Sequence, residues 1–340
     1  MKFSAAQLCA HLGNLVLSKQ NVGADFDSID SIESFESTSL VFLSDKPESL
    51  KTESFRPAIL VTSPATAELF KSASICLIAV SNVRLALALA KQKFADYDNS
   101  DSEWGEIHSS AIIHPSAKLG DGVRVGPNSV IGKDAEIANN VQIRANCVIE
   151  HGAFVGANSV LHSMVNIGYN CVIGERVIIR TGVVVGNEGF GFAQDDKRRY
   201  HRIPHTGIVH IADDVQIGSN SNIDRATYGV TSIARGVKID ALCHIAHNVN
   251  VGEDTLFVAQ CGVAGSSNIG ERVVLSGQTG VIDHRTIVDD AVLVHRCGVT
   301  ADVLEPGMWA GTPPKPFKEY VRDLNLAKKV TRLEKALEKD

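Results

Sequence analysis

VIGKDAEIANNVQIRANCVIE, residues 130–150, repeats a pattern six residues long. An aliphatic residue recurs at Ile131, Ile137, Ile143 and Ile149, and the residue four positions after each of them is small or β-branched. A fixed six-residue period of this kind is typical of a parallel β-helix, in which three hexads make one triangular coil. The stretch therefore predicts a β-solenoid.

The hexad series covers most of the chain. It runs from Ile107 to Val185 and from Ile211 to Ile223, and after a four-residue offset it continues from Ile233 to Val299. Coils stacked about 4.8 Å apart give roughly nine or ten coils and a prism on the order of 45 Å long. Because such a prism has flat faces, we expect binding sites at its interruptions (187–207 and 225–231), at an added domain or between neighbouring subunits.

The cysteines follow the same repeat. Five of the seven occupy the small slot of a hexad, and the chain has no CxxC pair; these five are Cys147, Cys171, Cys243, Cys261 and Cys297. We interpret them as compact buried residues and expect neither metal nor disulfide chemistry from them.

The two ends of the chain lack the hexad. Residues 1–100 predict a small α/β domain, with strands at 40–44, 58–62 and 75–80, a helix near the start, and a helix at 83–94 capped by Ser81 or Asn82. A polar linker at 96–106 leads into the prism domain, residues 107–310. Prolines within 305–316 then stop the coils, and residues 317–340 predict an amphipathic helix.

The C-terminal helix has an apolar seam and basic faces. Its seam follows coiled-coil spacing and its other faces are rich in lysine and arginine, which indicates either a solvated surface or a docking site for an acidic partner. The seam consists of Leu326, Val330, Leu333 and Leu337, and the basic residues are Lys328, Lys329, Arg332, Lys335 and Lys339.

Composition excludes some classes of protein. The chain has 340 residues and a net charge of −6, which argues against a nucleic-acid binder. We find neither a signal-peptide pattern at the N-terminus nor an apolar run of the roughly 18 residues that a membrane span needs. We therefore expect a cytoplasmic protein.

Two histidines in DALCHIAHNVNVG, residues 240–252, are candidates for catalysis. His247 and His244 occupy different slots of the hexad, so they do not form a helical metal clamp. One coil is 18 residues, which stacks His247 beside Gly265 and then beside Asp283 and the adjoining His284. A histidine beside the accessible N–H of a glycine suits acyl transfer, because the imidazole removes a proton from the attacking group and the N–H stabilises the oxyanion. A packed, hydrogen-bonded histidine is the alternative.

Several motifs resemble one family. GFGF (189–192), IPHTGIVHIADDVQIG (203–218), NIDRATYG (222–229), HIAHNVNVG (244–252) and GQTGVIDH (277–284) are similar to the UDP-3-O-(3-hydroxyacyl)glucosamine N-acyltransferases of lipid A biosynthesis in Gram-negative bacteria. The resemblance covers essentially the whole chain. It implies a left-handed β-helix, mainly β, with a small N-terminal α/β domain and a C-terminal helix, assembled as a homotrimer.

The resemblance also implies roles for particular residues. His247 is expected to be the general base for the glucosamine 2-amine, Gly265 to supply the oxyanion hole, and His284 to contact the acceptor. Phe42 matches an aromatic residue that stacks on uracil, whereas Glu48 stands where a second aromatic is expected. Asp240 is expected to orient His247. The acyl donor is acyl carrier protein, whose 4'-phosphopantetheine arm enters with it, and no resident cofactor or metal is expected.

Other functions remain open. The sister UDP-N-acetylglucosamine O-acyltransferase shares the prism and the HIAH motif, but it lacks an IDR-type motif and a comparable N-terminal domain. A zinc enzyme of the γ-carbonic anhydrase type needs a histidine set for which His201, His205 and His210 are the weak candidates. A non-catalytic scaffold leaves His247 and His284 unexplained, and a nucleotidyltransferase needs a glycine-rich phosphate loop that residues 1–100 lack.

Overall fold

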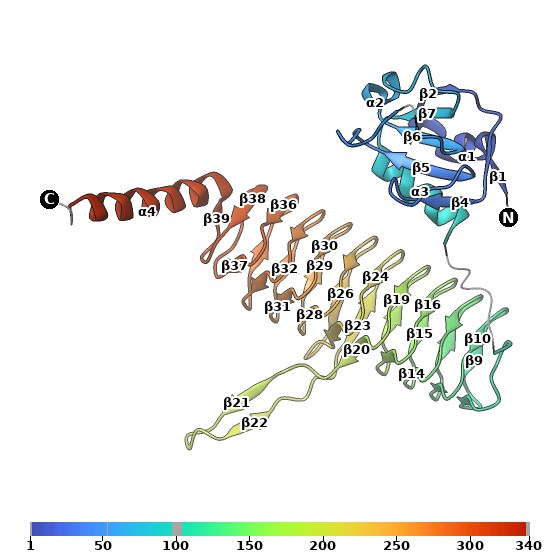
Figure 1. Ribbon diagram of the computed structural model, residues 1–340. Coiled ribbons are helices and arrows are strands. Elements are labelled where there is room, and N and C mark those ends of the chain that lie inside the picture. The colour runs from blue at the N-terminus through green and yellow to red at the C-terminus, as the bar shows by residue number, and fades with distance from the viewer. Residues whose placement is uncertain (1, 53, 97–103, 338–340) are drawn as a thin grey trace. The chain divides into compact units, whose positions relative to one another are not determined.

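The chain forms two compact units, Met1–Asp98 and Asn99–Asp340. The computed structural model describes residues 2–52, 54–96 and 104–337. Most of the linker expected at 96–106 lies outside these residues. Figure 1 shows the solenoid of the second unit and the α/β fold of the first.

The N-terminal unit is built on a five-stranded sheet with the strand order β2-β7-β6-β5-β4. β2 runs antiparallel to β7, and the other neighbours pair in parallel. The three strands expected from the sequence correspond to β5, β6 and β7. The elements are β1 (Phe3–Ser4), α1 (Ala5–Leu12), a 3₁₀ turn (Gly13–Leu15), β2 (Val16–Gln20), β3 (Asp25–Phe26), β4 (Ser28–Asp30), β5 (Ser39–Leu43), β6 (Ile59–Thr62), α2 (Pro64–Glu68), β7 (Cys76–Val80) and α3 (Val83–Phe94).

Local sequence explains where the two long helices of this unit begin. Ser4 forms a capping box with Gln7 at the start of α1, and the side chain of Asn82 accepts a hydrogen bond from the Leu85 N–H at the start of α3. Of the two caps considered for α3, Asn82 is therefore the one used. The sequence pattern does not predict β1, β2, β3, β4 or α2, because these short elements have no clear apolar period.

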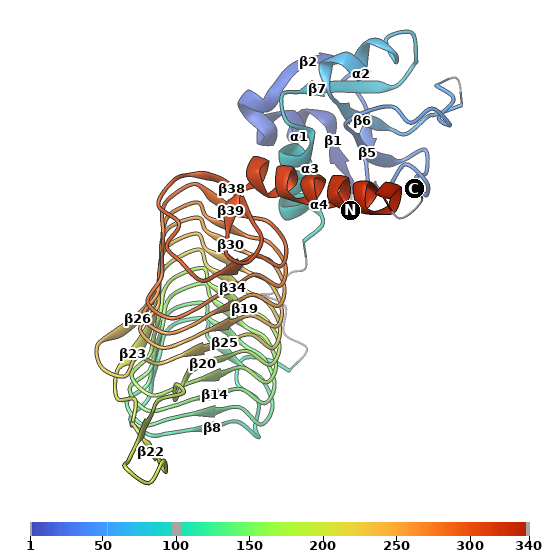
Figure 2. The same cartoon turned by 90° about the vertical axis from the view of Figure 1, so that its left-hand side faces the viewer.

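The second unit is a parallel β-solenoid with three sheets, one for each side of the coil (Figure 2). Strands one coil apart are hydrogen-bonded in register at an 18-residue offset, for example Gln142 beside Val160. One sheet contains β10 (Arg124–Val125), β13 (Gln142–Ile143), β16 (Val160–Leu161), β19 (Ile178–Ile179), β24 (Gln216–Ile217), β27 (Lys238–Ile239), β30 (Leu256–Phe257), β33 (Val274–Leu275), β36 (Ala291–Leu293), β38 (Gly307–Ala310) and β39 (Lys315–Pro316).

The other two sheets are assembled in the same way. The second contains β8 (Ile112–Ile113), β11 (Val130–Ile131), β14 (Val148–Ile149), β17 (Asn166–Ile167), β20 (Val184–Asn187), β25 (Asn222–Asp224), β28 (His244–Ile245), β31 (Gly262–Val263), β34 (Gly280–Val281) and β37 (Gly298–Val299). The third contains β9 (Lys118–Leu119), β12 (Glu136–Ile137), β15 (Phe154–Val155), β18 (Val172–Ile173), β23 (Ile208–Ile211), β26 (Val230–Ile233), β29 (Asn250–Val251), β32 (Asn268–Ile269) and β35 (Thr286–Ile287).

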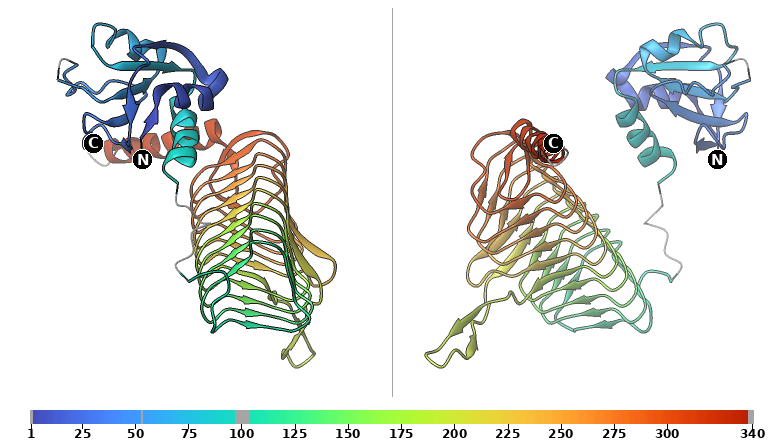
Figure 3. Two further views of the ribbon diagram at one scale, coloured as in Figure 1. Left: turned by 90° about the vertical axis from the view of Figure 1, so that its right-hand side faces the viewer. Right: turned by 60° about the vertical axis from the view of Figure 1, so that its left-hand side comes forward.

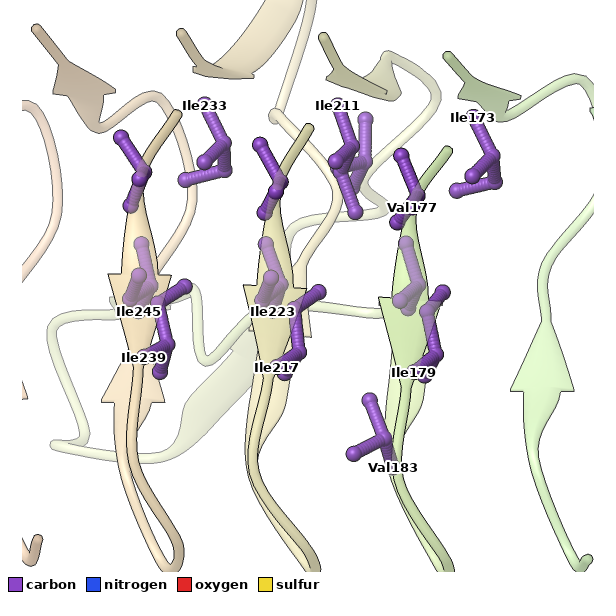
Figure 4. Close-up of a cluster of buried hydrophobic side chains, with 14 of the residues drawn as sticks. Ile173, Val177, Ile179, Val183, Ile211, Ile217, Ile223, Ile233, Ile239 and Ile245 are labelled. Carbon is purple, nitrogen blue, oxygen red and sulfur yellow. The ribbon is translucent and has the colours of Figure 1, made fainter. Parts of the chain in front are cut away.

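The core of the solenoid is a column of aliphatic side chains along its axis. The hexad aliphatics Ile179, Ile217, Ile223 and Ile245 are fully buried, and they lie beside their counterparts from neighbouring coils (Figure 4). Burying such a side chain stabilises the fold by about 1.5–3 kcal/mol. The hexad prediction of the fold is therefore confirmed.

The corners of the coils use the left-handed backbone region. Asn128, Asn140, Asn146 and Asn158 have φ between 58° and 61°, and each follows an inward aliphatic by three positions. Asparagine tolerates this region better than most residues, because its short side chain hydrogen-bonds locally. Corner asparagines therefore mark the turn of the coil and carry no functional signal of their own.

The two segments predicted to interrupt the repeat, 187–207 and 225–231, both depart from the regular coil. The first carries a hairpin of β21 (Phe192–Gln194) and β22 (Tyr200–Arg202) that projects from the prism (Figures 1 and 3). The second is a short loop between β25 and β26. Together they make the surface of the prism uneven near its middle.

The C-terminal end stops the stacking as expected. β38 adds one more parallel strand, β39 folds back antiparallel to it, and α4 (Phe317–Leu337) follows. Leu326 and Val330 are exposed on α4. The side chains of the other predicted seam residues, Leu333 and Leu337, and of Lys328, Arg332, Lys335 and Lys339 lie outside the described residues. No helix in the described residues is both long enough and apolar enough to cross a membrane.

We expect most thiols of the native protein to resist alkylation. All seven cysteines are free, and each is buried except Cys9, which is half-buried. Burial also raises the pKa of the Cys147 and Cys297 thiols to about 11, so little of the reactive thiolate forms at neutral pH. A thiol-titration assay should count at most Cys9 in the native protein and all seven after unfolding. Rapid native reaction of the five hexad cysteines would contradict their buried placement.

Candidate active site

A pocket of about 740 Å³ lies on the solenoid beside the root of the hairpin. Phe190 reaches it from the hairpin, and His247, Gly265, Asp283 and His284 line it from successive coils. The sequence-predicted register is therefore correct, since His247 and His284 share one corner with Gly265 between them. Backbone hydrogen bonds fix this stack: Ser266 N–H donates to His247 O, and His284 N–H donates to Gly265 O, both at 3.0 Å.

The floor of the pocket is a column of glycines. The outward-facing residue of β28 is His244. The equivalent positions in the next three coils are occupied by Gly262, Gly280 and Gly298. Apolar residues such as Val263 flank this column in the pocket. With coils about 4.8 Å apart, the open positions Gly262 and Gly280 span roughly 5 Å, whereas the Thr312 side chain lies over Gly298. This shape and polarity fit an alkyl chain.

The hydrogen bonds around His247 define its tautomer. Its Nδ1 lies 3.1 Å from Asn248 Oδ1. That oxygen also accepts from the Thr227 N–H at 3.0 Å, and Asn248 Nδ2 donates to Tyr228 O at 2.9 Å. Because the amide nitrogen of Asn248 faces a carbonyl, its oxygen must be the atom facing His247. The proton of the neutral imidazole then lies on Nδ1, and Nε2 carries the lone pair.

Asn248 connects His247 to the second interruption of the coil. Thr227 and Tyr228 belong to the loop between β25 and β26, and the Asn248 N–H also donates to Thr231 Oγ1 at 2.8 Å. The four-residue break in the hexad series thus supplies the partners that hold Asn248, which in turn holds His247. A regular coil would not provide them.

Replacing Asn248 with alanine should lower kcat by up to about 10²-fold with little change in KM, because the imidazole loses its fixed orientation. Steady-state kinetics of the acyl transfer that the family resemblance implies would measure both kcat and KM. Asn140→Ala is the matched control, since Asn140 occupies the same left-handed corner slot away from the pocket. Equal losses in both variants would show that only the corner geometry matters.

Gly265 packs directly under His247. A Cβ on Gly265 would lie 2.5 Å from His247 Cε1 and 2.7 Å from Nε2, so only glycine permits this approach. The N–H of Gly265 donates no hydrogen bond within the described residues. In the same slot at another corner, the N–H groups of Glu175 and Glu271 donate to an aspartate one coil further on. The N–H of Gly265 therefore has no partner among the described residues, and Gly265 itself is buried beneath the His247 ring.

The remaining predicted residues lie in different settings. His284 is exposed and lines the pocket, whereas Phe42 is half-buried on β5 of the other unit. Asp240 accepts the N–H groups of Ala241 and Ala259. The expectation that Asp240 orients His247 is therefore not met, because Asn248 is the residue hydrogen-bonded to the ring.

The zinc alternative gains no support. His201 pairs with Asp195 on the exposed hairpin, His210 lies on β23, and His205 is buried against His247. No group of three or more His, Cys, Asp or Glu side chains suited to a metal ion occurs in the part of the chain that the structure describes.

Sequence reasoning missed Asn248 and Asp224. Asn248 looks like any other corner asparagine of the repeat, and Asp224 occupies an outward strand position that is normally solvated. Asp224 lines the pocket, yet it is only 3% exposed. Both residues lie in motifs that carry the family resemblance, Asp224 in NIDRATYG (222–229) and Asn248 in HIAHNVNVG (244–252), but neither was given a role.

A hexad solenoid with a histidine, a free N–H and an apolar floor in one pocket places the chain among the hexapeptide-repeat acyltransferases. Comparison with known proteins identifies the family. The chain is 44% identical to the UDP-3-O-acylglucosamine N-acyltransferase of Methylococcus capsulatus over 91% of this chain and 88% of that protein. The protein of that name from Syntrophobacter fumaroxidans is 41% identical over 76% of this chain and 70% of its own length. The chain belongs to the UDP-3-O-acylglucosamine N-acyltransferase family.

Other proteins match parts of the chain. The family model for the GMPPB C-terminal domain matches residues 107–189. Among solved structures, the UDP-N-acetylglucosamine O-acyltransferase of Moraxella catarrhalis matches with a TM-score of 0.47 and 30% identity, covering 62% of this chain and 72% of that one.

Proposed function

We propose that this chain transfers a 3-hydroxyacyl group from acyl carrier protein to the 2-amine of UDP-3-O-(3-hydroxyacyl)-glucosamine in lipid A biosynthesis, with His247 as the general base. The observation that carries the proposal is the pairing of a fixed Nε2 lone pair with the free N–H of Gly265. Family membership supports the choice of an amine as the acceptor.

The residues account for each step of the transfer. The acceptor nitrogen attacks the thioester carbonyl while His247 Nε2 takes a proton from it. The carbonyl oxygen becomes an oxyanion, which the Gly265 N–H stabilises. When the tetrahedral intermediate collapses, the C–S bond breaks and the carrier thiolate leaves. The proton on His247 then passes to the thiolate, which gives the free thiol of the carrier and restores the neutral base.

The glycine floor is assigned to the alkyl part of an acyl chain. Its two open positions offer apolar contact, because a Cβ added at Gly262 or Gly280 would meet no protein atom within 4 Å. The space above these positions is therefore open to a ligand. The proposal includes a homotrimer, in which grooves between neighbouring prisms extend the site, and a UDP group held by the N-terminal unit at Phe42.

His284→Ala and Phe42→Ala should each raise the KM for the acceptor, by roughly tenfold for the loss of one good contact, which is about 1.4 kcal/mol. Both residues are proposed to bind the acceptor and not to take part in proton transfer, so kcat should change less than KM. Initial rates at varied acceptor concentration measure this. An unchanged KM in either variant would remove that residue from the site.

An assay with two competing acceptors tests the reaction. The purified protein is given 3-hydroxyacyl carrier protein together with UDP-3-O-acyl-glucosamine and UDP-N-acetylglucosamine. Acylation of the first acceptor alone supports the proposal. Acylation of UDP-N-acetylglucosamine would show the sister O-acyltransferase reaction instead, and reaction of neither acceptor would refute both.

A further inference from the structure

A buried carboxylate with no role in the mechanism above lies beside the base. Asp224 ends β25 in an outward-facing position, yet only 3% of it is exposed. Its Oδ1 accepts a hydrogen bond from Asn222 Nδ2 at 2.5 Å, and its Oδ2 lies 3.5 Å from His244 Nε2. Burial raises the pKa of this carboxyl group, whereas the neighbouring histidines and Asn222 lower it. A carboxylate buried in this way is costly unless it is compensated.

Three imidazoles act on the charge of Asp224. His244 lies 3.5 Å from it, and His247 and His205 also lower the pKa of the carboxyl group electrostatically. His205 comes from the end of the hairpin, and its ring contacts the His247 ring edge-on with centroids 4.9 Å apart. Its Nδ1 lies 2.9 Å from Ile203 O, and its buried Nε2 has no hydrogen-bond partner in the described residues.

The partner of His247 at Nδ1 is a neutral amide. When His247 takes a proton from the acceptor amine it becomes a cation, and Asn248 supplies a dipole but no opposite charge. The other charged or titratable groups near the pocket are Glu188, Arg225, Asp283 and His284. Asp283 is exposed, so solvent screens its charge, whereas the buried Asp224 is screened much less.

We propose that Asp224 is a positioning residue for the reaction: its carboxylate lies in the same pocket as His247, under the hairpin root, and provides the opposite charge for the His247 imidazolium formed during acyl transfer. This inference rests on the proposed function, and it adds a residue for which neither the sequence nor the comparisons gave a role. His244 and Asn222 hold the carboxylate in place, and the hairpin keeps water from it.

The proposal predicts the sign of a pH effect. An opposite charge nearby favours the charged form of histidine. Asp224→Asn removes that charge, so protonation of His247 should become less favourable in the variant. The acid limb of kcat/KM, where the base becomes protonated, should then shift to lower pH in Asp224→Asn. Turnover on the plateau should fall about tenfold, because the imidazolium of the transition state is less stabilised.

The experiment compares wild type, Asp224→Asn and Glu253→Gln between pH 5 and 9. Glu253 is an exposed acid outside the pocket, so its variant removes the same charge at a remote position. The acceptor amine also titrates in this range, but equally for all three proteins, so the difference between them is the quantity that counts. A second readout needs no substrate: the pH dependence of carbethoxylation at His247, followed by peptide mass spectrometry, reports its neutral fraction directly.

The proposal is supported if both the acid limb of kcat/KM and the carbethoxylation curve of His247 shift to lower pH in Asp224→Asn but not in Glu253→Gln. It is overturned if neither curve shifts in folded Asp224→Asn, or if both variants shift equally. If Asp224→Asn does not fold, Asp224→Ser removes the same charge and is tested in the same way. Wild type that makes no amide product would refute the proposed function instead, and the carbethoxylation measurement would still decide the inference about Asp224.

Discussion

Replacing His247 with alanine is expected to lower kcat by about 10²- to 10⁴-fold, the usual contribution of a general base. Without the imidazole, no other group in the pocket has a lone pair fixed beside Gly265. Binding of the acceptor should change little, because the base acts on a proton that moves only during the reaction. Initial rates together with equilibrium binding of UDP-3-O-acyl-glucosamine measure both quantities.

His295→Ala is the control for this variant. His295 stands in the same slot of its hexad, two residues after an inward aliphatic, but it is exposed at a different corner and does not line the pocket. It should retain wild-type activity. Turnover within twofold of wild type in His247→Ala would show that the base is elsewhere.

The second large effect is expected from Gly265→Ala. The new methyl group would lie 2.5 Å from His247 Cε1, a distance that real contacts do not reach, so the ring has to move. A displacement of about 1 Å at a reacting group can cost on the order of 10²-fold in rate. We expect a loss of this size in kcat with a much smaller change in melting temperature, since the clash is confined to the half-buried His247 ring.

Gly277→Ala is the matched control. Gly277 occupies the same hexad slot at another corner, and a Cβ there would meet its nearest atoms at 3.6 and 3.7 Å, which is ordinary contact. Its activity should match that of wild type. Full activity in Gly265→Ala would mean that neither the close approach of His247 nor the geometry of this N–H matters for turnover.

The sequence predicted the solenoid because one local rule, repeated along the chain, determines it. Inward aliphatics such as Ile131 and Ile143 recur every six residues, and each coil repeats the last after 18. That register alone placed His247 beside Gly265 and His284. The five buried cysteines followed from the same rule, and the structure confirms their burial.

The six-residue repeat could not predict which residues would lie beside His247. Asn248 looks like a routine corner asparagine until the loop at 225–231 folds against it and hydrogen-bonds to its amide. Asp224 occupies an outward strand position, yet it is buried, and it lines the same pocket as Phe190 from the hairpin root. Both contacts depend on how irregular segments pack on the prism, and a repeat contains no information about that. The expectation that Asp240 orients His247 came from the family resemblance, whereas Asn248 is the residue hydrogen-bonded to the ring.

The most direct test of the account is the chemical nature of the bond that the purified protein forms. The account predicts that incubation with 3-hydroxyacyl carrier protein and UDP-3-O-acyl-glucosamine gives a product heavier by one acyl group. Mild alkali should remove only the original ester and leave the new chain attached as an amide. A product from which alkali removes both chains, or no product at all, would contradict N-acylation by this pocket.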